Sequence, residues 1–132
     1  MKLRETWDSI WKKRELLNID EIIASDSCYH LLKKLIGPIP TNGLNILEVG
    51  CGSGVNTLAL LRKPQGDLPS LASLVDFSST ALTFARRNAE RNGMHANYVL
   101  ADAFKLPFPD GTFDIVHNAG VNEHFRGEMR QL

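Results

Sequence analysis

Three glycines in alternation, Gly50, Gly52 and Gly54, are the residues of this 132-residue chain that point most clearly to a chemical role. They follow the apolar run "LNILEV" directly, and Glu48 stands two positions before the first of them. Glycine has no Cβ, so this spacing lets the chain turn sharply from a strand into a helix while a ligand lies against its backbone. The alternative is a turn without a ligand, but three glycines are a costly way to make one, because each loses much conformational freedom on folding.

The spacing of the glycines and the charge of Glu48 restrict the class of ligand. The dinucleotide fingerprint is G-x-G-x-x-G/A, and counting from Gly50 places Val55 at its last position. The Glu48 carboxylate would repel a pyrophosphate at a helix N-terminus, whereas it would attract a cationic sulfonium with an α-amino group. The triphosphate-binding pattern G-x-x-x-x-G-K-[ST] does not occur in the sequence. The segment therefore favours S-adenosylmethionine over a nicotinamide dinucleotide.

Other polar residues stand where further strands are predicted to end. Short apolar runs alternate with amphipathic stretches, which predicts strands at 44–49, 71–76, 97–102 and 113–118, and helices over about 54–62 and 78–93. Such alternation is typical of a parallel sheet, in which ligands bind beyond the carboxyl ends of the strands. Those ends carry Glu48–Gly54, Asp76–Phe77, Asp102–Ala103 and Asn118–Gly120. We expect them to meet at one crevice; the alternative for Asp76 and Asp102 is a helix N-cap or turn acid.

The N-terminal part of the chain is predicted to be helical. Apolar residues at helical spacing predict one helix through about residue 17, and a second helix is predicted to begin at Ser25 or Asp26. A loop rich in glycine and proline follows. We therefore divide the chain into an N-terminal helical cap over residues 1–42 and a sheet domain over residues 43–132.

The composition is that of an ordinary globular domain, with 43% hydrophobic and 23% charged residues. Fifteen basic and fifteen acidic residues cancel, so nothing points to nucleic acid or a membrane surface as a partner. Cys28 and Cys51 make no disulfide framework, and no Cys/His cluster has the spacing of a metal site. The N-terminus is too polar for a signal peptide and no apolar run is long enough for a membrane span, so the chain is expected in the cytoplasm.

Three segments resemble motifs of the class I S-adenosylmethionine-dependent methyltransferases. "ILEVGCGSG" is similar to their motif I, and "LVDFSSTALTFARRNA" is similar to their second strand and following helix. "ADAFKLPFPDGTFDIV" is similar to the third- and fourth-strand region of the branch called methyltransferase domain type 11, near the ubiquinone- and menaquinone-biosynthesis enzymes. The three motifs in order are far more specific than motif I alone. The resemblance implies a Rossmann-like α/β fold with strand order 3-2-1-4 and flanking helices, acting on a small-molecule acceptor with S-adenosylhomocysteine as product.

The resemblance also implies which residues bind the methionyl part and the ribose of the cofactor. Gly50, Cys51 and Gly52 would approach the methionyl part, with only the backbone of Cys51 taking part. Glu48 would lie beneath them and order the loop or, through water, the amino group. Asp76 would accept hydrogen bonds from both ribose hydroxyls, which suits a carboxylate with two acceptor oxygens.

The remaining predicted contacts, implied in the same way, surround the adenine and the methyl end. Phe77 would pack on the adenine, Asp102 would accept from its amino group, and the Ala103 N–H would face a ring nitrogen. Asn118 and Ala119 would flank the methionyl end. The residues predicted to bind the cofactor are thus Glu48, Gly50, Cys51, Gly52, Gly54, Asp76, Phe77, Asp102, Ala103, Asn118 and Ala119.

Two histidines and two tryptophans are candidates for the acceptor side. His117 lies inside the fourth predicted strand and is expected to be a packed residue. His124, in "VNEHF", follows that strand where the family often has a similar "EH" pair, and we predict that it lines the acceptor side as a candidate general base. Trp7 and Trp11 form a stripe on the first predicted helix, which either docks that helix onto the core or covers the cofactor or acceptor as a lid.

The resemblance breaks off after the fourth strand. The family's sheet has seven strands, and strands five to seven would follow the point where this sequence stops. The fourth strand would then be an exposed edge, which favours aggregation unless it is covered. The chain is either a fragment, one part of a split enzyme or a self-associating protomer, and we expect a homo-oligomer or a complementing subunit to cover the edge. Two functions remain open: an active methyltransferase, and a module that binds S-adenosylmethionine or S-adenosylhomocysteine without activity of its own.

Overall fold

The computed structural model describes residues 2–25, 27–36, 43–62 and 71–119, and the statements below refer to these ranges. Their elements, in chain order, are α1 (Lys2–Lys12), α2 (Ile19–Ser25), α3 (Ser27–Ile36), β1 (Asn45–Val49), α4 (Val55–Leu61), β2 (Leu71–Asp76), α5 (Ser79–Arg91), β3 (Asn97–Leu100) and β4 (Ile115–His117). Among the helices of these ranges, none combines the length and the apolarity that a membrane span requires.

The four strands form one parallel sheet in the order β3-β2-β1-β4, which confirms the predicted topology. β1 and β2 are buried along almost their whole length because both have neighbours on either side in the sheet. Val49 lies opposite Val75, and Glu48 lies between Leu74 on one side and His117 on the other. The register thus brings the ends of β1, β2 and β4 to the same edge of the sheet.

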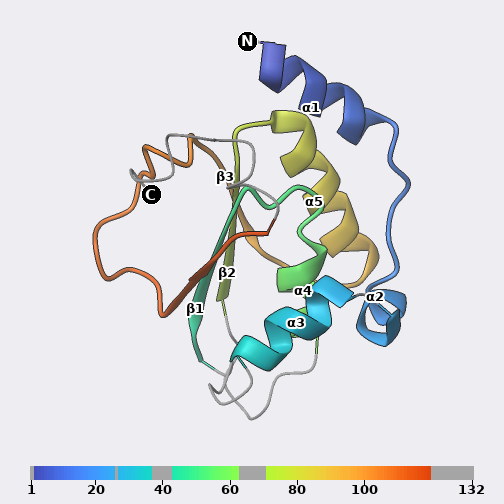
Figure 1. The fold of residues 1–132 in the computed structure, drawn as a ribbon, viewed down its shortest axis with the longest axis vertical. Helices are drawn as coiled ribbons and strands as arrows, with labels where there is room; N and C mark the ends of the chain where they lie inside the picture. Colours follow the sequence, from blue (N-terminus) through green and yellow to red (C-terminus); the bar gives the residue numbers. More distant parts are fainter. Residues whose placement is uncertain (1, 26, 37–42, 63–70, 120–132) are drawn as a thin grey trace.

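The helices cover one face of the sheet, and the segment that joins β3 to β4 covers the other (Figure 1). On that second face, Leu47, Val49 and Val75 pack against the joining segment, in which the rings of Phe108 and Phe113 meet edge to face with 4.9 Å between their centres. The two faces of the sheet are therefore buried by different kinds of structure.

The N-terminal helices share a hydrophobic core with the sheet domain. Ile19 of α2, Tyr29 and Ile36 of α3 belong to the same buried cluster as Leu58 of α4 and Ala89 of α5. Ile19 and Leu58 are fully buried, so this contact is a packed interface. It fixes the N-terminal region against the helical face of the sheet.

Local signals predicted some elements well and missed one. Ser78 caps α5, since its hydroxyl accepts a hydrogen bond from the Ala81 N–H, and Gly93 with a φ of 67° follows the helix end, as predicted. The prediction of one long first helix was wrong, because α1 ends at Lys12 and the chain continues in an extended segment to α2. α2 was not predicted, although the Asn18 side chain caps it by accepting from the Asp20 N–H at 2.9 Å.

Candidate functional site

The glycine loop between β1 and α4 has a backbone that only glycine adopts easily. Gly50, Gly52 and Gly54 have φ values of 68°, 52° and 71°, in the left-handed region that other residues occupy at a cost. The Cys51 N–H donates to the Val75 carbonyl at 2.9 Å, and the Gly54 N–H donates to the Cys51 carbonyl at 2.8 Å. The loop is thereby tied to the end of β2 and closed on itself before α4 begins.

Asp76 at the end of β2 is joined directly to this loop. Its Oδ2 accepts from the Gly52 N–H at 2.9 Å and its Oδ1 accepts from the Ser78 N–H at 3.0 Å. The residue is only 6% exposed, and burial raises the pKa of its carboxyl group although the N–H donors lower it. A carboxylate offers about four acceptor directions, and the Gly52 and Ser78 N–H groups use two of them.

Trp11 of α1 lies on the glycine loop. A Cβ added to Gly52 would stand 2.6 Å from both Cζ2 and Cη2 of the indole, closer than any real contact of this kind. The same indole packs on Phe84 of α5, with 5.8 Å between the ring centres. Trp11 therefore docks the helix onto the core and also covers the loop, so the two interpretations of the tryptophan stripe are compatible.

The rest of this face of α1 lies over the residues that follow β2. The Asp8 carboxylate accepts a hydrogen bond from the Ser78 hydroxyl, and the Arg4 guanidinium lies 5.9 Å from the centre of the Phe77 ring. Arg4, Asp8 and Trp11 are spaced by four and three positions, which places them on one side of a helix. α1 thus touches two of the four segments that the sequence predicted to hold the cofactor, the glycine loop and the residues after β2.

Glu48 faces the helical side of the sheet, where it forms a chain with Thr57 of α4 and His117 of β4. The Thr57 hydroxyl donates to Glu48 Oε2 at 2.5 Å and lies 2.8 Å from His117 Nε2. Burial raises the pKa of Glu48 to about 7 and lowers the pKa of His117 to about 4, so the low-dielectric site disfavours both charges. His117 Nδ1 has no hydrogen-bond partner among the described residues. His117 is therefore a packed residue, as its place in the strand predicted.

Two other residues of the loop have structural reasons for their type. Cys51 is buried, and burial together with the nearby carboxyl groups of Glu48 and Asp76 raises the pKa of its thiol well above the ordinary value, so the thiol stays protonated. A Cβ at Gly54 would stand 2.8 Å from Leu74 Cδ1, so this glycine is required by the packing of the core.

The other predicted contacts lie at the neighbouring strand ends. Asp102 is exposed, and its Oδ1 accepts from the Phe104 N–H at 2.9 Å, which is the turn-acid geometry named as the alternative for this residue. Ala103 packs on the face of the sheet opposite the helices. Asn118 is exposed and Ala119 is half-buried. The adenine and methionyl roles of these residues remain predictions, and His124 lies outside the described residues.

Three polar residues that touch the site were missed in the sequence. Asp8 and Thr57 lie on helices and look like ordinary surface and core residues, because their partners are distant in the chain. Asn88 follows the spacing of the apolar inner face of α5 and is fully buried. A polar residue at such a position is a signal that could have been noticed, because a buried amide requires partners.

Comparison with known proteins decides the family. A family model described as "Methyltransferase domain" matches residues 46–132, which is more than half of the chain. This chain belongs to that methyltransferase family. Its members take the methyl group from S-adenosylmethionine and release S-adenosylhomocysteine, as the glycine loop and the resemblance predicted.

Individual methyltransferases match different parts of the chain. A ubiquinone biosynthesis O-methyltransferase of Dinoroseobacter shibae is 32% identical over 132 residues, covering 97% of this chain and 51% of that protein. A ribosomal protein L11 methyltransferase of Burkholderia cenocepacia is 39% identical over 89 residues, covering 67% of this chain and 26% of that protein. A Methanococcus maripaludis structure described as an S-adenosylmethionine-dependent methyltransferase shares the fold, with a TM-score of 0.68 at 17% identity over 98% of this chain and 56% of its own. The matched part of this chain spans between about a quarter and somewhat over half of the length of these three proteins.

Proposed function

We propose that this chain binds S-adenosylmethionine against the glycine loop, Asp76 and Phe77, and transfers its methyl group to a small-molecule acceptor. The observation that carries the proposal is the hydrogen bond between the Gly52 N–H and Asp76 Oδ2. It joins the backbone proposed to hold the methionyl part to the carboxylate proposed to hold the ribose. The residues fit such a ligand, because the loop turns through the left-handed backbone of Gly50, Gly52 and Gly54, and a carboxylate such as Asp76 can accept from more donors than the two N–H groups of Gly52 and Ser78.

When bound, the cofactor supplies a methyl group on a positively charged sulfur, so it arrives already activated. What the chain contributes is position and exclusion of water. Asp76 would accept hydrogen bonds from vicinal hydroxyls. Glu48, whose pKa burial raises to about 7, would favour a nearby cation in its ionised form. Trp11 covers the loop from the side of α1.

The N-terminal helices support a small molecule as acceptor. The match to the ubiquinone biosynthesis O-methyltransferase covers 97% of this chain, whereas the match to the ribosomal protein L11 methyltransferase covers 67% of it. A helix packed over the loop and the end of β2 encloses the site, and enclosed sites suit small ligands.

The second candidate function is a module that binds the cofactor but has no activity of its own. Calorimetric titration with both forms of the cofactor tests binding, and a methyl-transfer assay on quinol- and catechol-type acceptors separates the two candidates.

Asp76→Asn tests the residue on which the proposal depends. Asparagine has the same size, but its NH₂ group must face one of the two N–H donors that the carboxylate accepts. We expect S-adenosylmethionine to bind at least about 100-fold more weakly and the free energy of unfolding to fall by about 1–3 kcal/mol. Asp114→Asn is the matched control, because Asp114 accepts from the Asn45 N–H at the opposite edge of the sheet. Equal cofactor affinity in the two variants would contradict the proposal.

We also propose that His124 lines the acceptor side and that the chain associates in the cytoplasm.

The edge of the sheet supports the association. Val116 on β4 is 59% exposed, and in the described part of the sheet β4 pairs with β1 alone. Such an edge favours pairing with a second chain. Light scattering at micromolar concentration is expected to give at least twice the mass of one chain, and a clean monomer would argue against self-association.

A further inference from the structure

Asn88 of α5 is a fully buried amide that bonds two separate parts of the chain. Its Oδ1 accepts from the Leu17 N–H at 2.9 Å, and its Nδ2 donates to the Ser53 carbonyl at 3.2 Å. Leu17 belongs to the extended segment between α1 and α2, and Ser53 lies within the glycine loop. One side chain therefore connects the N-terminal segment with the loop proposed to hold the cofactor.

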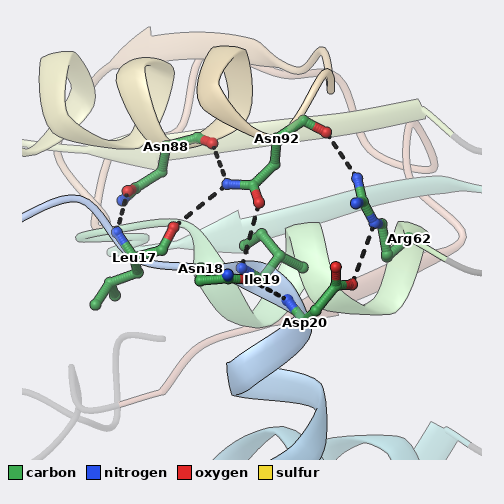
Figure 2. Close-up of polar contacts among 7 residues, drawn as sticks. All are labelled: Leu17, Asn18, Ile19, Asp20, Arg62, Asn88 and Asn92. Carbon is green, nitrogen blue, oxygen red and sulfur yellow. Dashed lines mark hydrogen bonds and ion pairs between the residues drawn. The ribbon is translucent and has the colours of Figure 1, made fainter.

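Asn92, the C-cap residue of α5, lies one helical turn after Asn88 and also holds this segment, but within the described ranges its side chain bonds no loop residue. Its Oδ1 accepts from the Ile19 N–H and its Nδ2 donates to the Leu17 carbonyl, both at 3.3 Å (Figure 2). Nδ2 also donates to the Asn88 carbonyl at 2.7 Å. The side-chain amide thus pairs with the backbone on both sides of residue 18, as a neighbouring strand would. We call the group that holds this segment the clasp; it consists of Leu17, Ile19, Asp20, Arg62 and Asn92.

Arg62, at the end of α4, closes the clasp from the other side. Its Nη1 donates to the Asn92 carbonyl at 2.7 Å, and its Nε lies 3.5 Å from Asp20 Oδ1 (Figure 2). Ile19 within the clasp is fully buried in the shared core. Residues 17–20 are therefore anchored to α5. Helix α1, which precedes them in the chain, lies over the glycine loop.

We propose that Asn88 is a positioning residue that couples the glycine loop to the clasp, so that the loop and the N-terminal segment become ordered together. This inference depends on the proposed function in one respect: it takes the glycine loop as the place where the cofactor binds. Loss of the amide leaves the Ser53 carbonyl and the Leu17 N–H without these partners, and unsatisfied buried groups are costly. In the intact protein, α1 and α5 hold the loop at two adjacent points, with Trp11 on Gly52 and Asn88 on Ser53.

Coupling of this kind is reciprocal. A ligand that orders the glycine loop must also stabilise segment 17–20, to which the loop is linked through Asn88. Binding of S-adenosylmethionine to the unmodified chain is therefore expected to slow amide hydrogen exchange at residues 17–20 several-fold.

The variants Asn88→Leu and Asn92→Leu form a matched pair, because both remove an amide that bonds Leu17 and only the first removes a bond to the glycine loop. In the chain without cofactor, Asn88→Leu is expected to speed amide exchange in residues 50–54 and 17–20 at least about tenfold. Asn92→Leu is expected to speed it in 17–20 alone. Calorimetry is expected to show S-adenosylmethionine binding at least about tenfold more weakly to the first variant and within about threefold of the unmodified chain for the second.

Unchanged exchange in the loop of Asn88→Leu, or equal losses of affinity in the two variants, overturns the proposal. Circular dichroism shows whether each variant folds; if Asn88→Leu does not, Asn88→Ala and Asn92→Ala provide the same comparison with smaller side chains. Failure of the unmodified chain to bind S-adenosylmethionine would remove the proposed function. The exchange comparison without cofactor still decides whether Asn88 couples the loop to the clasp.

Discussion

Gly52→Ala is expected to destabilise the protein by about 2–4 kcal/mol, because the new methyl group meets two obstacles at once. The backbone at Gly52 has a φ of 52°, which costs a non-glycine residue about 1 kcal/mol or more. The added Cβ would also stand 2.6 Å from the Trp11 indole, and overpacking of this kind costs about 1–3 kcal/mol. Urea unfolding followed by circular dichroism measures the sum.

Gly93→Ala separates the two contributions. Gly93 has a φ of 67°, but a Cβ there meets no described atom within 4 Å, so only the backbone cost of about 1 kcal/mol applies. In a Trp11→Ala background, Gly52→Ala is expected to cost only its backbone contribution of about 1 kcal/mol, and the double-mutant cycle measures the difference. Equal losses in Gly52→Ala and Gly93→Ala would show that Trp11 does not press on the loop. The proposed function adds that Gly52→Ala binds S-adenosylmethionine at least about 100-fold more weakly, with or without Trp11.

Glu48→Gln and His117→Leu are expected to change the pH dependence of stability in opposite directions. Glu48 has a folded-state pKa of about 7, above its ordinary 4.5, so its contribution to stability falls as the pH rises from about 4.5 to 7. His117 has a folded-state pKa of about 4, below its ordinary 6.5, so its contribution rises as the pH rises from about 4 to 6.5. Each shift corresponds to about 3 kcal/mol, and in the unmodified chain the two nearly cancel.

The variants remove one contribution each and expose the other. Glu48→Gln lacks the Glu48 contribution, so its stability relative to the unmodified chain is expected to rise by about 3 kcal/mol between pH 4.5 and 7. His117→Leu lacks the His117 contribution, so its stability relative to the unmodified chain is expected to fall by about the same amount between pH 4 and 6.5. Urea unfolding at a series of pH values measures both curves, and the difference between them removes the contributions of Asp76 and Cys51, which all three proteins share. Parallel curves would contradict the buried chain through Thr57.

Elements with local signals could be predicted, and contacts between distant segments could not. α5 was predicted at both ends because Ser78 and Gly93 are cap residues whose role depends on a few neighbours. β2 was predicted from Leu71 to Asp76 because a short, mostly apolar run is typical of a strand buried on both faces. α2 was missed because it has only seven residues, and such a short helix depends on packing for its stability.

The same distinction applies to the site. The segments at the ends of β1 and β2 were predicted from their residue types, and the parallel order brings them together. The partners of Glu48 were not predictable, since Thr57 and His117 approach it from α4 and from the neighbouring strand β4. Trp11 and Gly52 are 41 positions apart, and no pattern in the sequence relates one to the other.

Because α1 packs on the glycine loop, the tryptophan fluorescence of the protein reports the position of this helix. The chain has two tryptophans, Trp7 and Trp11, and both belong to α1, where their rings are stacked with 6.3 Å between their centres. Trp11 also lies beside Phe84 and under the Arg14 guanidinium. Indole emission moves to longer wavelengths when the ring enters water, so the fluorescence of the unlabelled protein records only whether this helix rests on the glycine loop. The rate at which the helix leaves or returns can thus be timed by stopped-flow mixing without any added dye.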